Sequence, residues 1–447
     1  MHHHLHHHRS GPRARRGLLL AGLLATSLAA AACGSSGSGT SAASTATTGV
    51  TINVVLASDP PPKAAMDEFT KETGITVNWT NVDWDSLQTK ISAAAAANTY
   101  FADATDVDWS RVGQFAKLDW FLPMETLLDT KSMEADVPQL ASFTEGGHVI
   151  GVPYDASFMV TTINKEMFDK GKQNPAPTTM DAYTQSLKAL KASGVQYPLN
   201  IPFAAAEGLS TYWYETTNAF GGQVLDKDGK PLFATPDTPG YKAAVWMIDA
   251  FKSGLVPPGN INVTDSQGQQ TLMAKGQVAS TFSDYSGVVG TVYNIPDSSS
   301  VVNKVEYLPT PGVSAAAGNL SNPDGIGVPK QAKYPQAAAK FIDWFTQSDR
   351  QAEFAGLNGP EKAFAGYFMP SHLSAVQKLA DKGTLNGGDI LAKLLAASKP
   401  VFAEGAPAGY PEFSNAVYTN LHAAAAGSET VPQAIQAIAN TANGLAS

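Results

Sequence analysis

The sequence predicts an α/β protein with two lobes. Short runs of β-branched residues alternate with amphipathic helical patterns, as in sheets covered by helices. The chain has 447 residues, which is more than one ordinary domain, and 43% of them are hydrophobic. This apolar content is enough for a packed core and excludes a mainly disordered chain.

The first predicted elements form a β-α-β unit. Residues 51–58 (TINVVLAS) are typical of a buried strand, and residues 63–73 place apolar side chains on one helical face before Gly74. Residues 75–79 (ITVNW) predict a second strand. Two strands joined through a helix are expected to be parallel, with a right-handed crossover.

The same alternation continues along the chain. Asp85 is predicted to cap the next helix. Asp226 to Gly229 predict a hairpin turn that lacks the spacing of a calcium loop. Further strands are expected at residues 103–108, 149–154 and 158–164, and further helices at 112–118, 178–194, 337–346 and in the alanine-rich C-terminal region.

Residues 1–32 predict a signal peptide. A basic segment precedes an apolar run of 16 residues at 17–32, which is short for a transmembrane helix of about 20 residues. Cys33 follows a run of alanines and resembles the lipobox of bacterial lipoproteins, although Ala30 stands where leucine is usual. That resemblance implies that Cys33 is lipidated and anchors the chain. The pair Arg15-Arg16 leaves Sec and twin-arginine export both open.

Residues 33–50 consist almost entirely of Gly, Ser, Thr and Ala. Such a composition cannot bury a core and predicts a flexible tether. The sequence therefore predicts an exported globular body, lipid-anchored to the outer face of the cytoplasmic membrane.

The charge balance argues against several classes of function. The net charge is −9, but four arginines lie in residues 1–32, and without them 26 basic residues face 39 acidic ones, a net charge of −13. Only Arg111 and Arg350 remain as arginines, so a nucleic-acid partner is not expected. Three histidines and one cysteine outside the first 32 residues leave no plausible zinc site, and no metal or cofactor is expected.

Motifs for common enzyme classes are absent from the sequence. It contains no phosphate-binding P-loop, no dinucleotide-binding glycine motif, no H-E-x-x-H and no G-x-S-x-G. These absences disfavour nucleotide-binding, metalloprotease and serine-hydrolase functions. An enzyme that uses two carboxylates needs no local motif and stays possible.

Aromatic residues stand beside carboxylates at predicted strand ends and loops. This pairing suits carbohydrates, because a sugar ring packs on an aromatic plane while carboxylates accept hydrogen bonds from its hydroxyls. Each aromatic residue fits a core position as well, and Trp246 and Trp344 are predicted to be core residues. The pairs are found at Val82–Asp85, Asp106–Trp109, Tyr154-Asp155, Tyr212–Glu215 and Asp284-Tyr285.

Three blocks of sequence resemble a known family. They are residues 69–77 (FTKETGITV), residues 151–168 (GVPYD leading to INKEMF) and residues 325–329 (GIGVP) before the helix at 337–351. The chain is similar, from about residue 51 to its end, to the extracellular solute-binding proteins of family 1. These lipoproteins supply carbohydrate ABC importers.

The resemblance implies a two-lobed periplasmic-binding-protein-like (type II) fold with a hinge. Lobe 1 would comprise residues 51–156 and 309–350, and lobe 2 residues 157–308 and 351–447. The lobes would close on a sugar, with no chemistry performed, and a monomer would then dock on a membrane permease. Two arginines outside the first 32 residues favour a neutral ligand.

The resemblance also implies the ligand-binding residues. Tyr285 follows Asp284 where many family members have a tryptophan. The residues expected to line the two sides and the seam of the site are Ser58, Asp59, Asp108, Trp109, Tyr154, Asp155, Tyr212, Trp213, Asp284, Tyr285 and Asp324.

Other functions stay open at this point. Acidic and aromatic clusters could bind a polyamine through charge pairing and cation–π contact. A secreted glycoside hydrolase that uses two of the carboxylates is a further alternative, and a purely structural or adhesive role is another.

Overall fold

The computed structural model describes residues 43–264, 267–355, 369–403 and 405–446. The predicted signal peptide at 1–32, the predicted lipidation site Cys33 and most of the predicted tether lie outside these residues. The tether and lobe boundaries stay predictions. Within the described residues, no helix combines the length and the apolar character needed to cross a membrane.

The first sheet has five strands in the order β2-β1-β3-β12-β6. Strands β1 and β2 are parallel and joined through α1 (Lys63–Thr73), so the predicted β-α-β unit is confirmed. Strand β12 runs antiparallel to both of its neighbours. The strands are β1 (Val50–Leu56), β2 (Ile75–Asn81), β3 (Ala104–Asp108), β6 (Val152–Asp155) and β12 (Asp324–Gly327).

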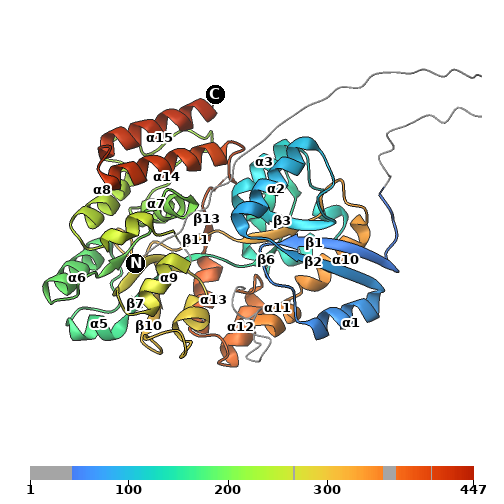
Figure 1. The fold of residues 1–447 in the computed structure, drawn as a ribbon, viewed down its shortest axis with the longest axis horizontal. Coiled ribbons are helices and arrows are strands. Elements are labelled where there is room, and N and C mark those ends of the chain that lie inside the picture. The colour runs from blue at the N-terminus through green and yellow to red at the C-terminus, as the bar shows by residue number, and fades with distance from the viewer. Residues whose placement is uncertain (1–42, 265–266, 356–368, 404, 447) are drawn as a thin grey trace, which may run out of the picture. The chain divides into compact units, whose positions relative to one another are not determined.

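Helices cover both faces of this sheet (Figure 1). Val54 packs with Phe69 of α1 and Phe341 of α10, whereas the next residue, Val55, packs with Leu87 of α2 on the other face. This alternation is the period of two expected of a strand buried on both sides. The helices and short strands on this side are α2 (Trp84–Ala97), α3 (Val112–Lys117), α4 (Thr130–Met133), α10 (Pro335–Phe345), α11 (Ser348–Ala355), β4 (Thr144–Glu145) and β5 (His148–Val149), with 3₁₀ turns η1 (Trp109–Arg111), η2 (Met124–Thr126) and η3 (Pro138–Phe143).

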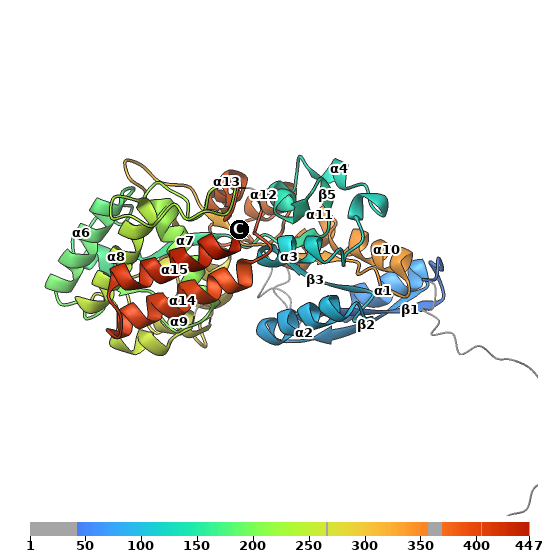
Figure 2. The same cartoon turned by 90° about the horizontal axis from the view of Figure 1, so that it is seen from above.

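The second sheet has four strands in the order β10-β7-β9-β8. Met159 of β7 packs with helices α6 to α8, and Val160 packs with α9 and α13. Helices α14 and α15 contact each other and α8, as Figure 2 shows. The elements are β7 (Met159–Asn164), β8 (Leu199–Asn200), β9 (Ser280–Tyr285), β10 (Val305–Leu308), α5 (Lys165–Lys170), α6 (Met180–Ala192), α7 (Glu207–Ala219), α8 (Pro239–Lys252), η4 (Pro258–Asn262), α9 (Gln267–Ala274), η5 (Val289–Tyr293), α12 (Leu373–Asp381), α13 (Gly388–Ala397), α14 (Tyr410–Ala426) and α15 (Val431–Leu445).

Short pairings connect the segments that run between the two sheets. The chain leaves β6 at Asp155 and enters β7 at Met159, and Phe158 forms an antiparallel bridge with Ser321. Ser321 belongs to β11 (Leu320–Ser321), which pairs in parallel with β13 (Lys399–Pro400). The returning strand β12 begins three residues after Ser321.

Two local predictions were wrong. Asp83, not Asp85, caps α2, because its side chain accepts a hydrogen bond from the Ser86 amide. The aromatic segment Tyr212–Glu215 lies inside helix α7 rather than in a loop, and nearly every residue of that helix is buried. A helix buried on all sides has no amphipathic stripe that would reveal it in the sequence.

Helix α15 begins with a capping box, which allows a test of the C-terminal helices. The Thr430 side chain accepts from the Gln433 amide, and the Gln433 side chain accepts from the Thr430 amide. Thr430→Ala is expected to lower the free energy of unfolding by about 1 kcal/mol. Urea unfolding checks this, with the exposed Thr235→Ala as control. A variant as stable as the wild type would mean that the capping box does not stabilise α15.

Candidate functional site

The first sheet has one edge at which β1, β3 and β6 end and β12 begins. Strand β1 is parallel to β3, and β12 places Asp324 opposite both Asp108 and Asp155. Residues Ser58 and Asp59 follow β1 at the same edge. We name Ser58, Asp59, Asp108, Asp155 and Asp324 the carboxyl edge. Ligands of open α/β sheets bind outside the carboxyl ends of strands.

Asp108 organises the turn that follows β3. It is 2% exposed, and its Oδ1 accepts hydrogen bonds from the Ser110 amide at 2.8 Å and from the Ser110 hydroxyl. These bonds cap η1, the turn that carries Trp109 and Arg111. Burial raises the pKa of Asp108, while its hydrogen bonds to Ser110 and the charge of Arg111 oppose that rise.

Asp106 lies on the same face of β3, one period before Asp108. It accepts hydrogen bonds from Gln88 Nε2 at 2.6 Å and from the Tyr154 hydroxyl at 3.0 Å. Burial, together with the neighbouring charge of Asp108, raises the pKa of Asp106 to about 7. Tyr154 is therefore a buried partner of a carboxyl group, with an exposed fraction of 4%.

Asp155 and Asp324 have carboxyl groups with raised pKa values. Asp155 Oδ1 accepts from the Met369 amide at 3.2 Å, and burial raises the pKa of Asp155 to about 8. Burial, and then the charges of Asp106, Asp108 and Asp155, raise the pKa of Asp324 well above its usual range. Protonated carboxyl groups can donate as well as accept hydrogen bonds, which suits the hydroxyls of a neutral ligand.

Trp109 is covered by aromatic side chains from the C-terminal segment. Its ring stacks on Phe402 with a centroid separation of 6.2 Å and meets Tyr410 edge-on at 5.5 Å. Only 8% of Trp109 is exposed. A ligand would reach this indole only after Phe402 and Tyr410 move away from it.

Ser58 and Asp59 lie where β1 ends beside β2. The Asp59 carboxylate accepts from Asn81 Nδ2 at 2.9 Å, and the Ser58 carbonyl accepts from Trp79 Nε1 at 2.9 Å. The Ser58 hydroxyl is buried and has no hydrogen-bond partner among the described residues. It is thus a polar group at this edge that a ligand could satisfy.

Tyr212 and Trp213 lie in the core beneath the second sheet. The Tyr212 hydroxyl donates to Gln269 Oε1 at 2.7 Å, and Trp213 Nε1 donates to the Gly240 carbonyl at 2.8 Å. The Trp213 ring is fully buried and packs against Phe233 at 4.8 Å. Both side chains have structural partners in this arrangement.

Asp284 and Tyr285 end strand β9. Asp284 is buried and accepts from the hydroxyls of Thr162 and Tyr293, each at 2.7 Å. Burial raises the pKa of Asp284 to about 6. Tyr285 is partly buried and pairs with Met159 of β7.

The structure thus brings the predicted site residues together in two groups. Asp324 is the register partner of Asp108 and of Asp155. Trp109 follows Asp108 directly in the chain, and the Tyr154 hydroxyl donates a hydrogen bond to Asp106 of the same strand. Tyr212, Trp213, Asp284 and Tyr285 belong to α7 and β9 in the second lobe. Which of these residues touch a ligand stays a prediction.

Sequence reasoning missed Glu207, a polar residue close to this edge. Glu207 accepts hydrogen bonds from the hydroxyls of Tyr410 and Ser414, and burial raises its pKa to about 7. Its charge interacts with Arg111 and Asp108. No local signal marks Glu207, because its partners are distant in the sequence. Asp106 was named in the cluster Asp106–Trp109 but not among the predicted ligand-binding residues.

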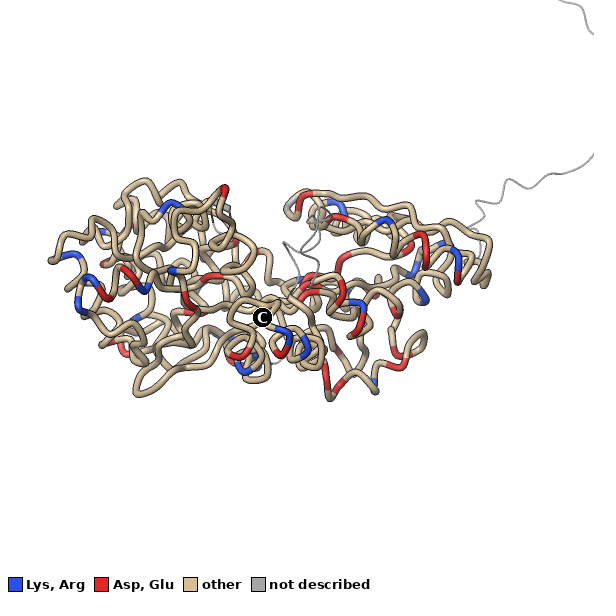
Figure 3. The backbone as a smooth tube through the Cα atoms, turned by 90° about the horizontal axis from the view of Figure 1, so that it is seen from below, with Lys and Arg blue, Asp and Glu red and all other residues tan. Residues whose placement is uncertain are grey.

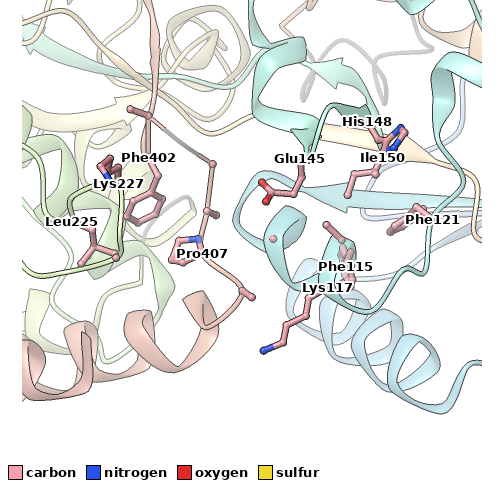
Figure 4. A pocket seen from close by; sticks show the side chains of 18 of the residues that line it. Phe115, Lys117, Phe121, Glu145, His148, Ile150, Leu225, Lys227, Phe402 and Pro407 are labelled. Carbon is pink, nitrogen blue, oxygen red and sulfur yellow. The ribbon is translucent and has the colours of Figure 1, made fainter. Parts of the chain in front are cut away.

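A separate cavity of about 810 Å³ lies beside α3. Figure 4 shows Phe115, Lys117 and Glu145 on one side of it, and Leu225 and Phe402 on the other. None of the eleven predicted ligand-binding residues lines this cavity.

Among the described residues, no group of three or more His, Cys, Asp or Glu side chains is arranged to hold a metal ion. Along the described chain, Figure 3 shows basic positions scattered among acidic ones.

Residues 56–352 match the bacterial extracellular solute-binding protein family. The chain belongs to this family. A Brucella abortus (strain 2308) protein named only as a binding protein is 26% identical over 297 residues, which cover 64% of this chain and 68% of that protein. The resemblance found in the sequence is therefore confirmed.

Solved structures show that this solute-binding protein has the two-lobed periplasmic-binding fold, as predicted. Maltose-bound MalE3 of T. maritima superimposes with a TM-score of 0.75 at 20% identity, over 89% of this chain and 100% of that one. A ribitol complex from Agrobacterium radiobacter gives 0.76 at 22% identity, over 89% and 99%. An α-D-tagatose complex from Thermotoga lettingae gives 0.74 at 20% identity, over 89% and 100%.

Proposed function

We propose that this solute-binding protein captures a neutral sugar or polyol at the carboxyl edge and delivers it to the permease of an ABC importer. The observation that carries the proposal is the grouping of Asp108, Asp155 and Asp324 beside Trp109, where the strands of the first sheet end. Carboxyl groups with raised pKa values offer donors and acceptors, and the Trp109 ring offers a plane for a sugar face once Phe402 and Tyr410 move away from it.

The rest of the proposal concerns the cycle and the location. The two lobes close on the solute, and the closed form docks on the permease. The protein acts as a monomer outside the cytoplasm and is held at the membrane through lipidated Cys33. Proteins of the same fold are bound to maltose, ribitol and tagatose, which supports a polyhydroxylated ligand. The proposed cycle contains no covalent step.

A thermal-shift panel tests the ligand class. We expect one of maltose, ribitol, D-mannitol or tagatose to raise the unfolding temperature of the full chain, since a ligand at 100 times its Kd stabilises the folded state by about 2.7 kcal/mol. The response should be nearly independent of salt, because the ligand is uncharged.

The other functions are outcomes of the same panel. A shift with spermidine alone, lost as salt increases, would replace the sugar by a polyamine. Release of the leaving group from an aryl glycoside would revive the hydrolase. No shift across a broad panel of glycans and polyols would contradict the proposed ligand class.

A further inference from the structure

Trp109 is shared between the two sheets. It follows β3 of the first sheet, yet its ring packs in the hydrophobic cluster of α7, α8 and α14 beside the second sheet. Phe402 lies nearly parallel to the indole, with an angle of 25° between the ring planes and 6.2 Å between the centroids, and Tyr410 meets it edge-on. The plane that the proposed solute needs is therefore covered by side chains of the chain itself.

The two covering rings are held in different ways. Tyr410 begins α14, and its hydroxyl donates a hydrogen bond to Glu207 of α7, so this ring moves only together with its helix. Phe402 has no polar group and is held by packing, which includes ring contacts to Tyr214 at 5.6 Å and to Tyr410 at 5.7 Å. Each aromatic pair contributes a factor of roughly 2 to 12 to an equilibrium constant. A ligand of ordinary affinity can break such contacts.

A space for the displaced ring lies next to Phe402. This side chain forms part of the wall of the 810 Å³ cavity beside α3, together with apolar side chains such as Phe115, Ile150 and Leu225 (Figure 4). A cavity of about 150 Å³ lined by such residues is large enough for benzene. The phenyl ring of Phe402 thus has room on the cavity side.

The backbone is fixed on both sides of Phe402. Before it, β13 pairs with β11, and the Lys399 amide donates to the Asn319 carbonyl at 2.9 Å. After it, the chain lies directly against α3, since a Cβ atom on Gly113 would be 2.2 Å from the carbonyl oxygen of Ala406. The side chain of Phe402, rather than its backbone, is therefore the part that can change its position.

We propose that Phe402 is a movable cover of the solute site: it lies on Trp109 while the site is empty and turns into the cavity beside α3 when a solute binds. The proposal rests on the proposed function of this edge. Opening of the lobes carries Tyr410 away with α14, whereas closure would return Phe402 to the plane that the solute now occupies. The cavity thus supports binding without contacting the solute, and the affinity includes the cost of displacing the ring.

The cover is tested on the full chain without any ligand. A soluble nitroxide broadens the NMR signals of exposed groups, and the indole N–H resonance of Trp109 is assigned with Trp109→Phe. We expect weak broadening in the wild type and clearly stronger broadening in Phe402→Ala. If the alanine variant does not fold, Phe402→Leu, which keeps apolar volume but no flat ring, should also show stronger broadening than the wild type. Equal broadening in wild type and variants overturns the proposal.

The role of the cavity is tested by filling it. Ala116 of α3 lines the cavity and is only partly buried, so Ala116→Phe should place a ring there. The control Leu118→Phe adds the same ring at an exposed position outside the cavity lining. With maltose, ribitol, D-mannitol and tagatose as probes, Phe402→Ala should raise the affinity about tenfold, and Ala116→Phe should lower it about tenfold. Leu118→Phe should leave the affinity unchanged.

The double variant separates this proposal from a structural role of the cavity. In the Phe402→Ala background, Ala116→Phe should change the affinity by less than about twofold, because no ring then needs the cavity. An equal loss in both backgrounds overturns the proposal, and so does a lower affinity of Phe402→Ala, which would mean that this ring contacts the solute. If no probe binds any of these proteins, the proposed ligand class fails and displacement by a sugar fails with it, while the nitroxide measurement still decides whether Phe402 covers Trp109.

Discussion

Trp213→Ala is expected to lower the free energy of unfolding by roughly 3–5 kcal/mol, because it removes a large side chain from a closed core. The indole is fully buried, packs against Phe233 and donates a hydrogen bond to the Gly240 carbonyl at 2.8 Å. Alanine would leave a cavity there and would remove this hydrogen bond. Urea unfolding followed by circular dichroism measures the loss.

The matched control is Trp84→Ala at the start of α2. Trp84 is only partly buried, so its replacement should cost clearly less. Wild-type stability in Trp213→Ala would contradict the core position of this residue. Solute binding in that variant would then decide whether Trp213 lines the site.

The fold was predictable where the sequence carries a local pattern. The helix expected at residues 63–73 has these bounds in the structure, because an apolar face precedes a glycine that adopts the left-handed conformation at Gly74. Helix α7 was missed because its residues are buried on nearly every side, so that Tyr212 and Trp213 beside Glu215 resembled an exposed aromatic loop. Burial on all sides removes the periodicity on which sequence-based prediction depends.

The candidate site was predictable only in part. Residues after predicted strands, such as Asp108 and Asp155, could be named because parallel strands end at a common edge. Their pairing with Asp324 follows from the insertion of β12 between β3 and β6, which no local pattern reveals. The contact of Glu207 with Tyr410 likewise joins two helices that are far apart in the sequence.

Glu215 of α7 connects this helix to the segment between β10 and β12. Its two carboxyl oxygens accept hydrogen bonds from the Thr310 hydroxyl and, at 3.1 Å, from the Leu320 amide. The side chain is fully buried, and burial raises the pKa of Glu215 to about 8. The folded chain therefore binds this proton more tightly than the unfolded chain does. The stability that this group contributes is fully present below the unfolded pKa of 4.5 and is lost as pH rises toward 8.

Glu215→Gln should remove this dependence on pH. Glutamine has the same shape, can accept from the Leu320 amide and can donate to Thr310, and it has no charge to lose. The variant is expected to match the wild type near pH 4.5 and to exceed its free energy of unfolding by roughly 3 kcal/mol at pH 7. Urea unfolding from pH 4.5 to 9 measures the difference, with the exposed Glu72→Gln as control. Parallel curves for Glu215→Gln and wild type would show that Glu215 ionises in the folded protein as it does in the unfolded chain, and that the Thr310 to Leu320 segment is held without a buried proton.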